Sequence, residues 1–134
     1  MAFKLVSRLG GDTPPFEYRL MTDAEGCTLG EALAESSGRL TKCGPTATPE
    51  FIAMRTQAPE AASVTPVPVI RVTELIEFGT TFSANGTAVN VGDKVTLNTD
   101  GLQVTATATG GVFMVSGKAA GATAGSPVTG FFRR

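Results

Sequence analysis

The chain has 134 residues, a formal net charge of −1, and neither histidine nor tryptophan. This length is typical of one domain, and the small negative charge argues against nucleic acid or an anionic membrane as a partner, since both are bound through basic residues. Because histidine is the commonest general base and metal ligand, we expect no enzymatic activity, no cofactor and no metal site.

Residues 1–12 are predicted to form an N-terminal arm. The arm is apolar at Phe3, Leu5 and Val6, but a serine and an arginine interrupt this short run, so it does not resemble a signal peptide and we expect the protein to stay in the cytoplasm where it is made. A strand followed by the pair Gly10-Gly11 is typical of a segment that leaves its own domain and pairs with another sheet. The alternative is that the segment closes its own domain.

Residues 13–134 are interpreted as a single β domain made of two similar units, 13–72 and 75–134. The central match aligns LGEAL at 29–33 with VGDKV at 91–95. Segments on both sides of this match recur in the same order, with nearly the same spacing. We therefore expect the two units to have the same conformation and to share one core.

The duplication decides how the helix-like stretch at 29–40 is interpreted. In the second unit the corresponding residues, VTLN, alternate between apolar and polar and precede the turn signal Asp100-Gly101, which is typical of a β-hairpin. The first unit should then contain a strand at Glu31–Glu35, a turn at Ser37-Gly38 and a returning strand at Leu40–Cys43.

Each unit continues with two more predicted strands. Pro66 and Pro68 remove two backbone donors, so the strand that they open should lie at a sheet edge or begin at a bulge. The expected fold is all-β, with the two units related by a pseudo-two-fold axis in a small barrel or sandwich. The predicted strands are Phe51–Met54 and Val67–Val72 in the first unit, and Val112–Val115 and Val128–Arg133 in the second.

Few residues are candidates for a catalytic, redox or metal-binding role. Glu31 and Asp93 occupy the same place in the two units, directly after a glycine, and we interpret them as the starts of strands beside solvated turns rather than as an acid–base pair. Cys27 and Cys43 are predicted to be small buried residues rather than a disulfide. No catalytic, cofactor-binding or metal-binding residue is therefore assigned.

The two ends of the chain supply the candidates for partner binding. Phe131 and Phe132 could form an exposed anchor, but their alignment with the predicted strand at 67–72 favours a place in the core. The arginines that follow them stay available to a partner. The candidate partner-binding residues are Phe3, Leu5, Val6, Arg133 and Arg134.

Several segments resemble the small structural proteins encoded in the head gene clusters of tailed phages and prophages, which decorate and stabilise the capsid. The resemblance extends over nearly the whole chain and is carried by structural positions rather than by a catalytic motif. Its segments are PFEY at 15–18, LGEAL with SSGRL at 29–40, PEFIAM at 49–54, VPVIRV at 67–72 and VGDKVTLNTDGLQVTAT at 91–107.

The resemblance implies a structural virion protein on the outside of the phage head, made in the bacterial cytoplasm and not secreted. It implies the major capsid protein as partner, a homo-oligomer, often a trimer, as the assembled form, and stabilisation of the expanded shell as function. Deleting residues 1–9 is then expected to abolish shell binding and to leave the domain folded. The alternative function is a receptor- or glycan-binding module of a virion or tail.

Overall fold

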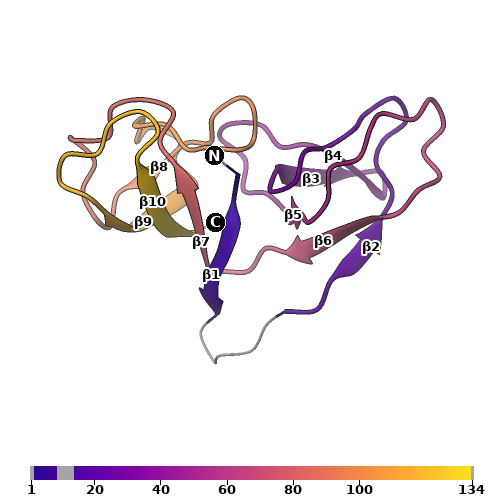
Figure 1. The fold of residues 1–134 in the computed structure, drawn as a ribbon, viewed down its shortest axis with the longest axis horizontal. Helices are drawn as coiled ribbons and strands as arrows, with labels where there is room; N and C mark the ends of the chain where they lie inside the picture. The colour runs from indigo at the N-terminus through magenta and orange to yellow at the C-terminus, as the bar shows by residue number, and fades with distance from the viewer. Residues whose placement is uncertain (1, 9–13, 134) are drawn as a thin grey trace.

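The computed structural model of the protein describes residues 2–8 and 14–133. Within these residues the chain forms ten strands and no helix, and the strands make two antiparallel five-stranded sheets (Figure 1). The prediction of an all-β fold is confirmed. No helix in the described ranges is long and apolar enough to cross a membrane.

The two sheets are formed largely by different parts of the chain. In the first sheet the strand order is β1 (Lys4–Arg8), β7 (Ile76–Thr81), β10 (Pro127–Phe132), β9 (Phe113–Lys118) and β8 (Lys94–Val95). In the second sheet the order is β2 (Glu17–Arg19), β6 (Val67–Arg71), β5 (Phe51–Ala53), β3 (Ala32–Ser36) and β4 (Arg39–Lys42). The first sheet therefore joins the N-terminal strand to the second half of the chain.

Four strands of each sheet follow one another in a similar pattern. The order β2-β6-β5-β3 in the second sheet corresponds to β7-β10-β9-β8 in the first. Glu17 of β2 pairs with Val69 of β6, and Glu77 of β7 pairs with Phe131 of β10. The duplication of the unit stays a prediction, but these orders are what it requires.

The helix-like stretch at 29–40 is a β-hairpin. β3 and β4 pair from Leu33 with Lys42 to Ser36 with Arg39. Ser37 and Gly38 between them have φ angles of 51° and 79°, and positive φ at both turn residues is characteristic of the tightest hairpin connection. The predicted strand, turn and returning strand are thus confirmed.

The prediction that Pro68 places its strand at a sheet edge is wrong, because β6 lies between β2 and β5. The N–H of Met54 donates to the carbonyl of Pro68 over 2.9 Å, so the backbone of Pro68 faces the end of β5. The N–H and C=O of one strand residue point to the same neighbour, and β5 ends at Ala53. The N–H that Pro68 lacks would therefore have pointed beyond the last residue of β5, so its absence removes no hydrogen bond between the two strands.

The main core contains residues from both sheets, so the two sheets form a sandwich with one shared interior. Four phenylalanine rings lie at its centre with centroids 5.1 to 5.7 Å apart in the contacting pairs. A Cβ atom at Gly130 would lie 2.7 Å from the ring of Phe113, so only glycine allows that ring to cross β10. The four rings are Phe3, Phe78, Phe113 and Phe132.

A smaller cluster covers the other face of the second sheet, so that this sheet is buried on both sides. Phe51 of β5 is fully buried in it, and the guanidinium groups of Arg19 and Arg71 lie 5.0 and 4.7 Å from the centre of its ring. Arg19 also pairs with Glu35, and Arg71 pairs with Glu17. Charged residues therefore close the cluster towards solvent.

Replacing Phe132 by alanine should lower the free energy of unfolding by about 3–5 kcal/mol, because the side chain is fully buried among three other rings. The matched control is Phe131→Ala, which removes a partly exposed ring from the opposite face of the same strand and should cost less than about 1.5 kcal/mol. Urea unfolding followed by circular dichroism measures both. Equal losses would contradict the assignment of Phe132 alone to the core.

Candidate functional site

The N-terminal segment closes its own domain in this structure. β1 pairs antiparallel with β7 at the edge of the first sheet. Phe3 is 2% exposed, and its ring packs against Phe113 and Phe132. The N–H of Phe3 donates to the carbonyl of Gly30 over 3.0 Å. Gly10 and Gly11, which the sequence suggested would let the segment leave its own domain, lie outside the described residues.

Gly30 is required where the N-terminal segment contacts the turn before β3. Its φ is +82°, and a Cβ atom there would lie 2.4 Å from the Cβ of Ala2. Both the backbone conformation and the close approach exclude a larger residue. The contact between Ala2 and the residue before Glu31 therefore requires glycine at position 30.

The predicted partner-binding residues do not form one exposed cluster. Leu5 is half-buried against the core, whereas Val6 is 49% exposed. Arg133 is held at the other end of the chain, where its guanidinium lies 4.9 Å from the centre of the Phe131 ring and donates to the carbonyl of Glu74. Arg134 lies outside the described residues.

Sequence reasoning missed a pair of exposed rings at the edge of the second sheet. Tyr18 lies on the edge strand β2 and is 66% exposed, and Phe16, just before this strand, is 49% exposed. Glu17 between them pairs with Arg71. The alternation of ring, charge and ring was the available signal, because alternate residues of a strand share a face. We call Phe16 and Tyr18 the β2 aromatic edge.

Glu31 and Asp93 perform the same local task. The N–H of Thr28 donates to Oε1 of Glu31 over 3.0 Å, and the N–H of Asn90 donates to Oδ2 of Asp93 over 2.9 Å. In both cases a carboxylate closes a four-residue turn by accepting from the N–H three residues before it. The interpretation of these acids as turn residues at the starts of strands is confirmed.

Glu31 differs from Asp93 because it is buried rather than solvated. Its residue is 4% exposed, since the turn at Gly101 lies over it: the N–H of Ala32 donates to the carbonyl of Gly101 over 2.8 Å. The expectation of a solvated turn is therefore wrong for Glu31. Sequence could not reveal the contact, because it joins residues seventy positions apart in the chain.

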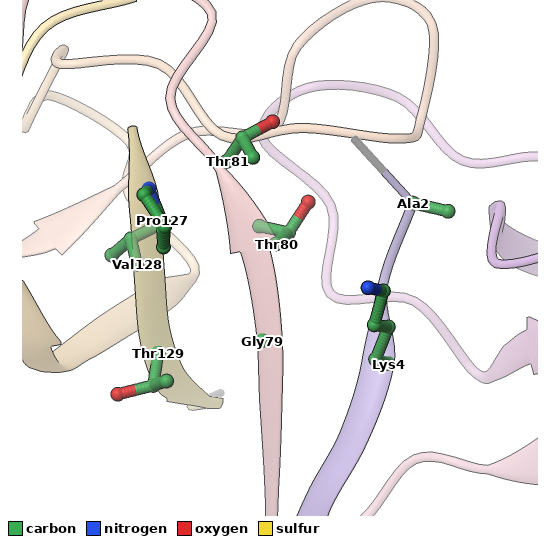
Figure 2. Close-up of a pocket in the computed structure, with 8 residues that line it drawn as sticks. All are labelled: Ala2, Lys4, Gly79, Thr80, Thr81, Pro127, Val128 and Thr129. Atoms are coloured by element: carbon green, nitrogen blue, oxygen red, sulfur yellow. The ribbon is translucent and has the colours of Figure 1, made fainter. Parts of the chain in front are cut away.

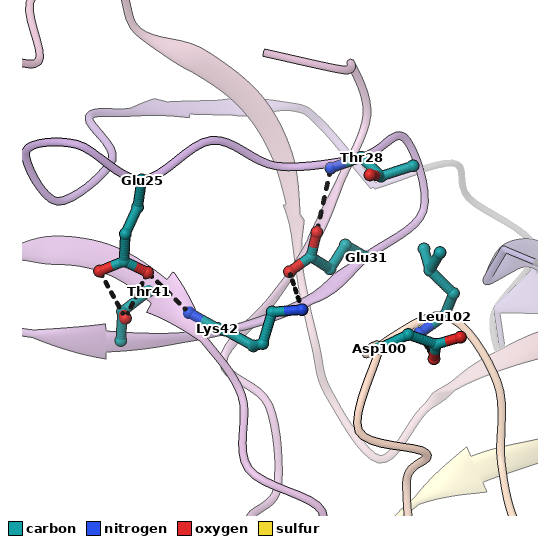
Figure 3. A network of polar contacts seen from close by, with 7 residues as sticks. All are labelled: Glu25, Thr28, Glu31, Thr41, Lys42, Asp100 and Leu102. Atoms are coloured by element: carbon teal, nitrogen blue, oxygen red, sulfur yellow. Dashed lines mark hydrogen bonds and ion pairs between the residues drawn. The ribbon is translucent and has the colours of Figure 1, made fainter. Parts of the chain in front are cut away.

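One oxygen of the Glu31 carboxylate has no hydrogen-bond partner. Oε2 is shielded from solvent, and the nearest cation is the ammonium of Lys42, 3.9 Å away (Figure 3). Burial raises the pKa of Glu31, and the charges of Asp100 and Glu25 act in the same direction. The bond from Thr28 and the charge of Lys42 oppose this rise.

A shallow depression of about 360 Å³ has Glu31 among its lining residues. It lies between the turn before β3, the end of β4 and the segment after β5. Its walls combine hydroxyl, amide and thiol groups with two small apolar side chains. The lining residues are Gly26, Cys27, Thr28, Glu31, Lys42, Thr56, Gln57, Ala58 and Pro59.

The two cysteines are buried and unpaired, as predicted. The thiol of Cys27 donates to the carbonyl of Arg55 over 3.4 Å, and the thiol of Cys43 to that of Ala47 over 3.3 Å. Burial raises the pKa of both thiols, for Cys43 to about 11. Since the thiolate is the reactive form, these cysteines are poor nucleophiles.

A second depression, of about 210 Å³, lies across the edge of the first sheet between β1, β7 and β10 (Figure 2). It exists because Gly79 has no side chain at the centre of this surface. Lys4 is its single charged side chain, and hydroxyl and methyl groups provide the remaining surface. Its lining residues are Ala2, Lys4, Gly79, Thr80, Thr81, Pro127, Val128 and Thr129.

No protein-family model, no curated protein and no solved structure matches the chain. Within residues 2–8 and 14–133, no group of three or more histidine, cysteine, aspartate or glutamate side chains is arranged to hold a metal ion. The two sites that stand out are therefore the β2 aromatic edge and the depression at Glu31.

Replacing Phe3 by alanine should lower the free energy of unfolding by about 3–5 kcal/mol, because the ring belongs to the core. Val6→Ala, three residues further along the same segment and with an exposed side chain, should change it by no more than about 0.5 kcal/mol. Urea unfolding measures both. A folded domain of unchanged stability after Phe3→Ala would indicate an arm that is detached in solution. For the same reason, deleting residues 1–9 should destabilise the domain as well as any partner contact.

Replacing Glu31 by glutamine should make stability less dependent on pH. The folded-state pKa of Glu31 lies above its unfolded value, so the folded protein holds the proton more tightly and wild-type stability is lost as pH rises from about 4.5 through the folded-state pKa. Glutamine keeps an acceptor for Thr28 and carries no charge. The stability of Glu31→Gln relative to wild type should therefore grow over this interval, and a difference that is constant with pH would refute the assignment.

Proposed function

We propose that the protein is a structural component of a phage virion, which binds the outer surface of the head and stabilises the expanded shell without catalysis. The proposal rests on the resemblance of its segments to capsid decoration proteins and on one structural observation. That observation is the β2 aromatic edge, an exposed pair of rings on and directly before the edge strand of the sandwich.

The β2 aromatic edge suits docking to another protein. Exposed apolar groups on a soluble domain favour a partner surface when they cluster, and tyrosine and phenylalanine are enriched at the centres of interfaces. The outer side of β2 also presents backbone groups that no strand of the described residues pairs, so a strand of the partner could add to this sheet. We place the partner contact here rather than at Phe3, which is buried.

The partner in this proposal is the major capsid protein. A shell presents the same surface many times, so contacts that are individually weak can together hold neighbouring subunits against pressure from inside. A homo-oligomer, a trimer in the resembling family, would add to this effect by engaging several subunits at once. The fully buried core of the sandwich supports the rigidity that such a clamp requires.

The second candidate is a receptor- or glycan-binding module of a virion or tail. The β2 aromatic edge is the observation that favours it, because exposed aromatic rings stack on sugars as well as on protein surfaces. The two candidates differ in the partner, and the same residues would serve both.

Co-sedimentation with undecorated shells of the source phage tests the proposal. Wild-type protein should bind expanded shells saturably and immature shells more weakly, and the double variant Phe16→Ser, Tyr18→Ser should reduce binding to expanded shells by at least about tenfold, since buried interface rings contribute 2 kcal/mol or more. Val64→Ser, which changes another exposed apolar residue, is the matched control and should bind like wild type.

Failure to bind either form of the shell would overturn the decoration proposal. A glycan array probed with the same three proteins then decides the second candidate. Binding to a sugar that is lost in the double variant and kept in Val64→Ser would establish it.

A further inference from the structure

Oε2 of Glu31 is the one buried side-chain nitrogen or oxygen in the described residues that has no hydrogen-bond partner. A charged oxygen in this state is costly, because burial removes water without supplying a donor. The fold nevertheless keeps the carboxylate there, and its other oxygen is fixed by Thr28. This pre-positioned acceptor lines the depression between β3, β4 and the segment after β5.

We propose that this depression is a binding site for a primary ammonium group, with Glu31 as its acceptor. The inference is independent of the proposed function. An incoming ammonium would donate a charge-assisted hydrogen bond to an oxygen that is already desolvated and held in place, so the bond forms without a further cost for stripping water from the carboxylate.

Lys42 indicates which chemistry the site accepts. Its ammonium faces Oε2 of Glu31 at 3.9 Å, whereas a charge-assisted N–H···O bond is about 2.7–2.9 Å long. The ammonium of Lys42 thus faces Oε2, but it is about 1 Å too far away to form a hydrogen bond with it. Its side chain is 55% exposed, so it can move into solvent and leave its place to a ligand ammonium that is not tied to β4.

The walls of the depression fit the rest of such a ligand. Ala58 and Pro59 offer an apolar surface for an alkyl stem, and Thr56 and Gln57 add a hydroxyl and an amide to the lining. An anion is disfavoured by the carboxylate. A quaternary ammonium has no N–H to donate, so it cannot satisfy Oε2. The ligand class is therefore an alkylammonium, either a free amine or the lysine side chain of another protein.

The test is a nuclear magnetic resonance titration of the whole chain with n-butylammonium chloride at about pH 8, well above the ordinary pKa of a carboxyl group and below that of an alkylamine. The backbone N–H of Thr28, which donates to Glu31, is the reporter. Its signal should move saturably with n-butylammonium and stay unmoved with tetramethylammonium chloride at the same ionic strength.

Two variants separate binding at Glu31 from a general effect of charge. Glu31→Gln should weaken binding by about tenfold or more, the loss expected for one charge-assisted hydrogen bond. Lys42→Met should instead tighten binding severalfold, because it removes the competing cation and keeps a side chain of similar length. Thermal unfolding checks that both variants are folded, and Lys42→Met tests the proposal even if Glu31→Gln does not fold.

Nα-acetyl-lysine methylamide distinguishes the two sources of the ammonium. Binding of both this compound and n-butylammonium supports a lysine of a partner protein, and binding of n-butylammonium alone supports a free amine. The proposal is overturned if wild type and Lys42→Met both fail to bind n-butylammonium, or if tetramethylammonium moves the Thr28 signal equally.

Discussion

The structure depends on the packing of four phenylalanine rings between its two sheets. Neither sheet is large enough to bury its inner face alone. The rings of the first sheet are buried by packing against the aliphatic side chains of the second. One ring comes from the N-terminal segment and three from β7, β9 and β10. The cluster thereby fixes the start of the chain, the first sheet and the second sheet in one interior. The four are Phe3, Phe78, Phe113 and Phe132.

The same packing explains why a carboxylate is buried. Bringing the sheets together places the turn at Gly101 on the residues that open β3, and the backbone bond from Ala32 to Gly101 fixes that contact. Glu31 lies beneath the turn and loses its water. Glu31 closes its local turn in the same way as Asp93 does, yet only Glu31 is buried. The burial of Glu31 is therefore caused by the turn at Gly101 and not by the turn that its carboxylate closes.

Sequence was sufficient wherever the fold is decided by local pattern. The alternation around Val95 and the turn signal at Asp100-Gly101 predicted a hairpin for both units. The 29–40 stretch forms it, whereas the second unit has an isolated bridge between Leu97 and Val104 in place of two paired strands. The sequence was insufficient wherever contacts between distant segments determine the position or the burial of a residue. Pro68 is tolerated inside a sheet because β5 ends beside it, and Phe3 is buried because rings from residues more than a hundred positions away surround it. The alternation at 16–18 placed the two rings of the β2 aromatic edge on one face. Their exposure to solvent could not be predicted, because it depends on which strand lies at the sheet edge.

The distribution of strands along the chain also sets an order for folding during synthesis. All strands of the second sheet lie between Glu17 and Arg71, so every hydrogen-bonded strand partner in that sheet is synthesised before β7. β1 precedes the other nine described strands, yet its partner β7 comes about seventy residues later, and β10 follows later still. The N-terminal strand must therefore wait, unpaired, while the second sheet assembles, and the long loop between β1 and β7 closes only late.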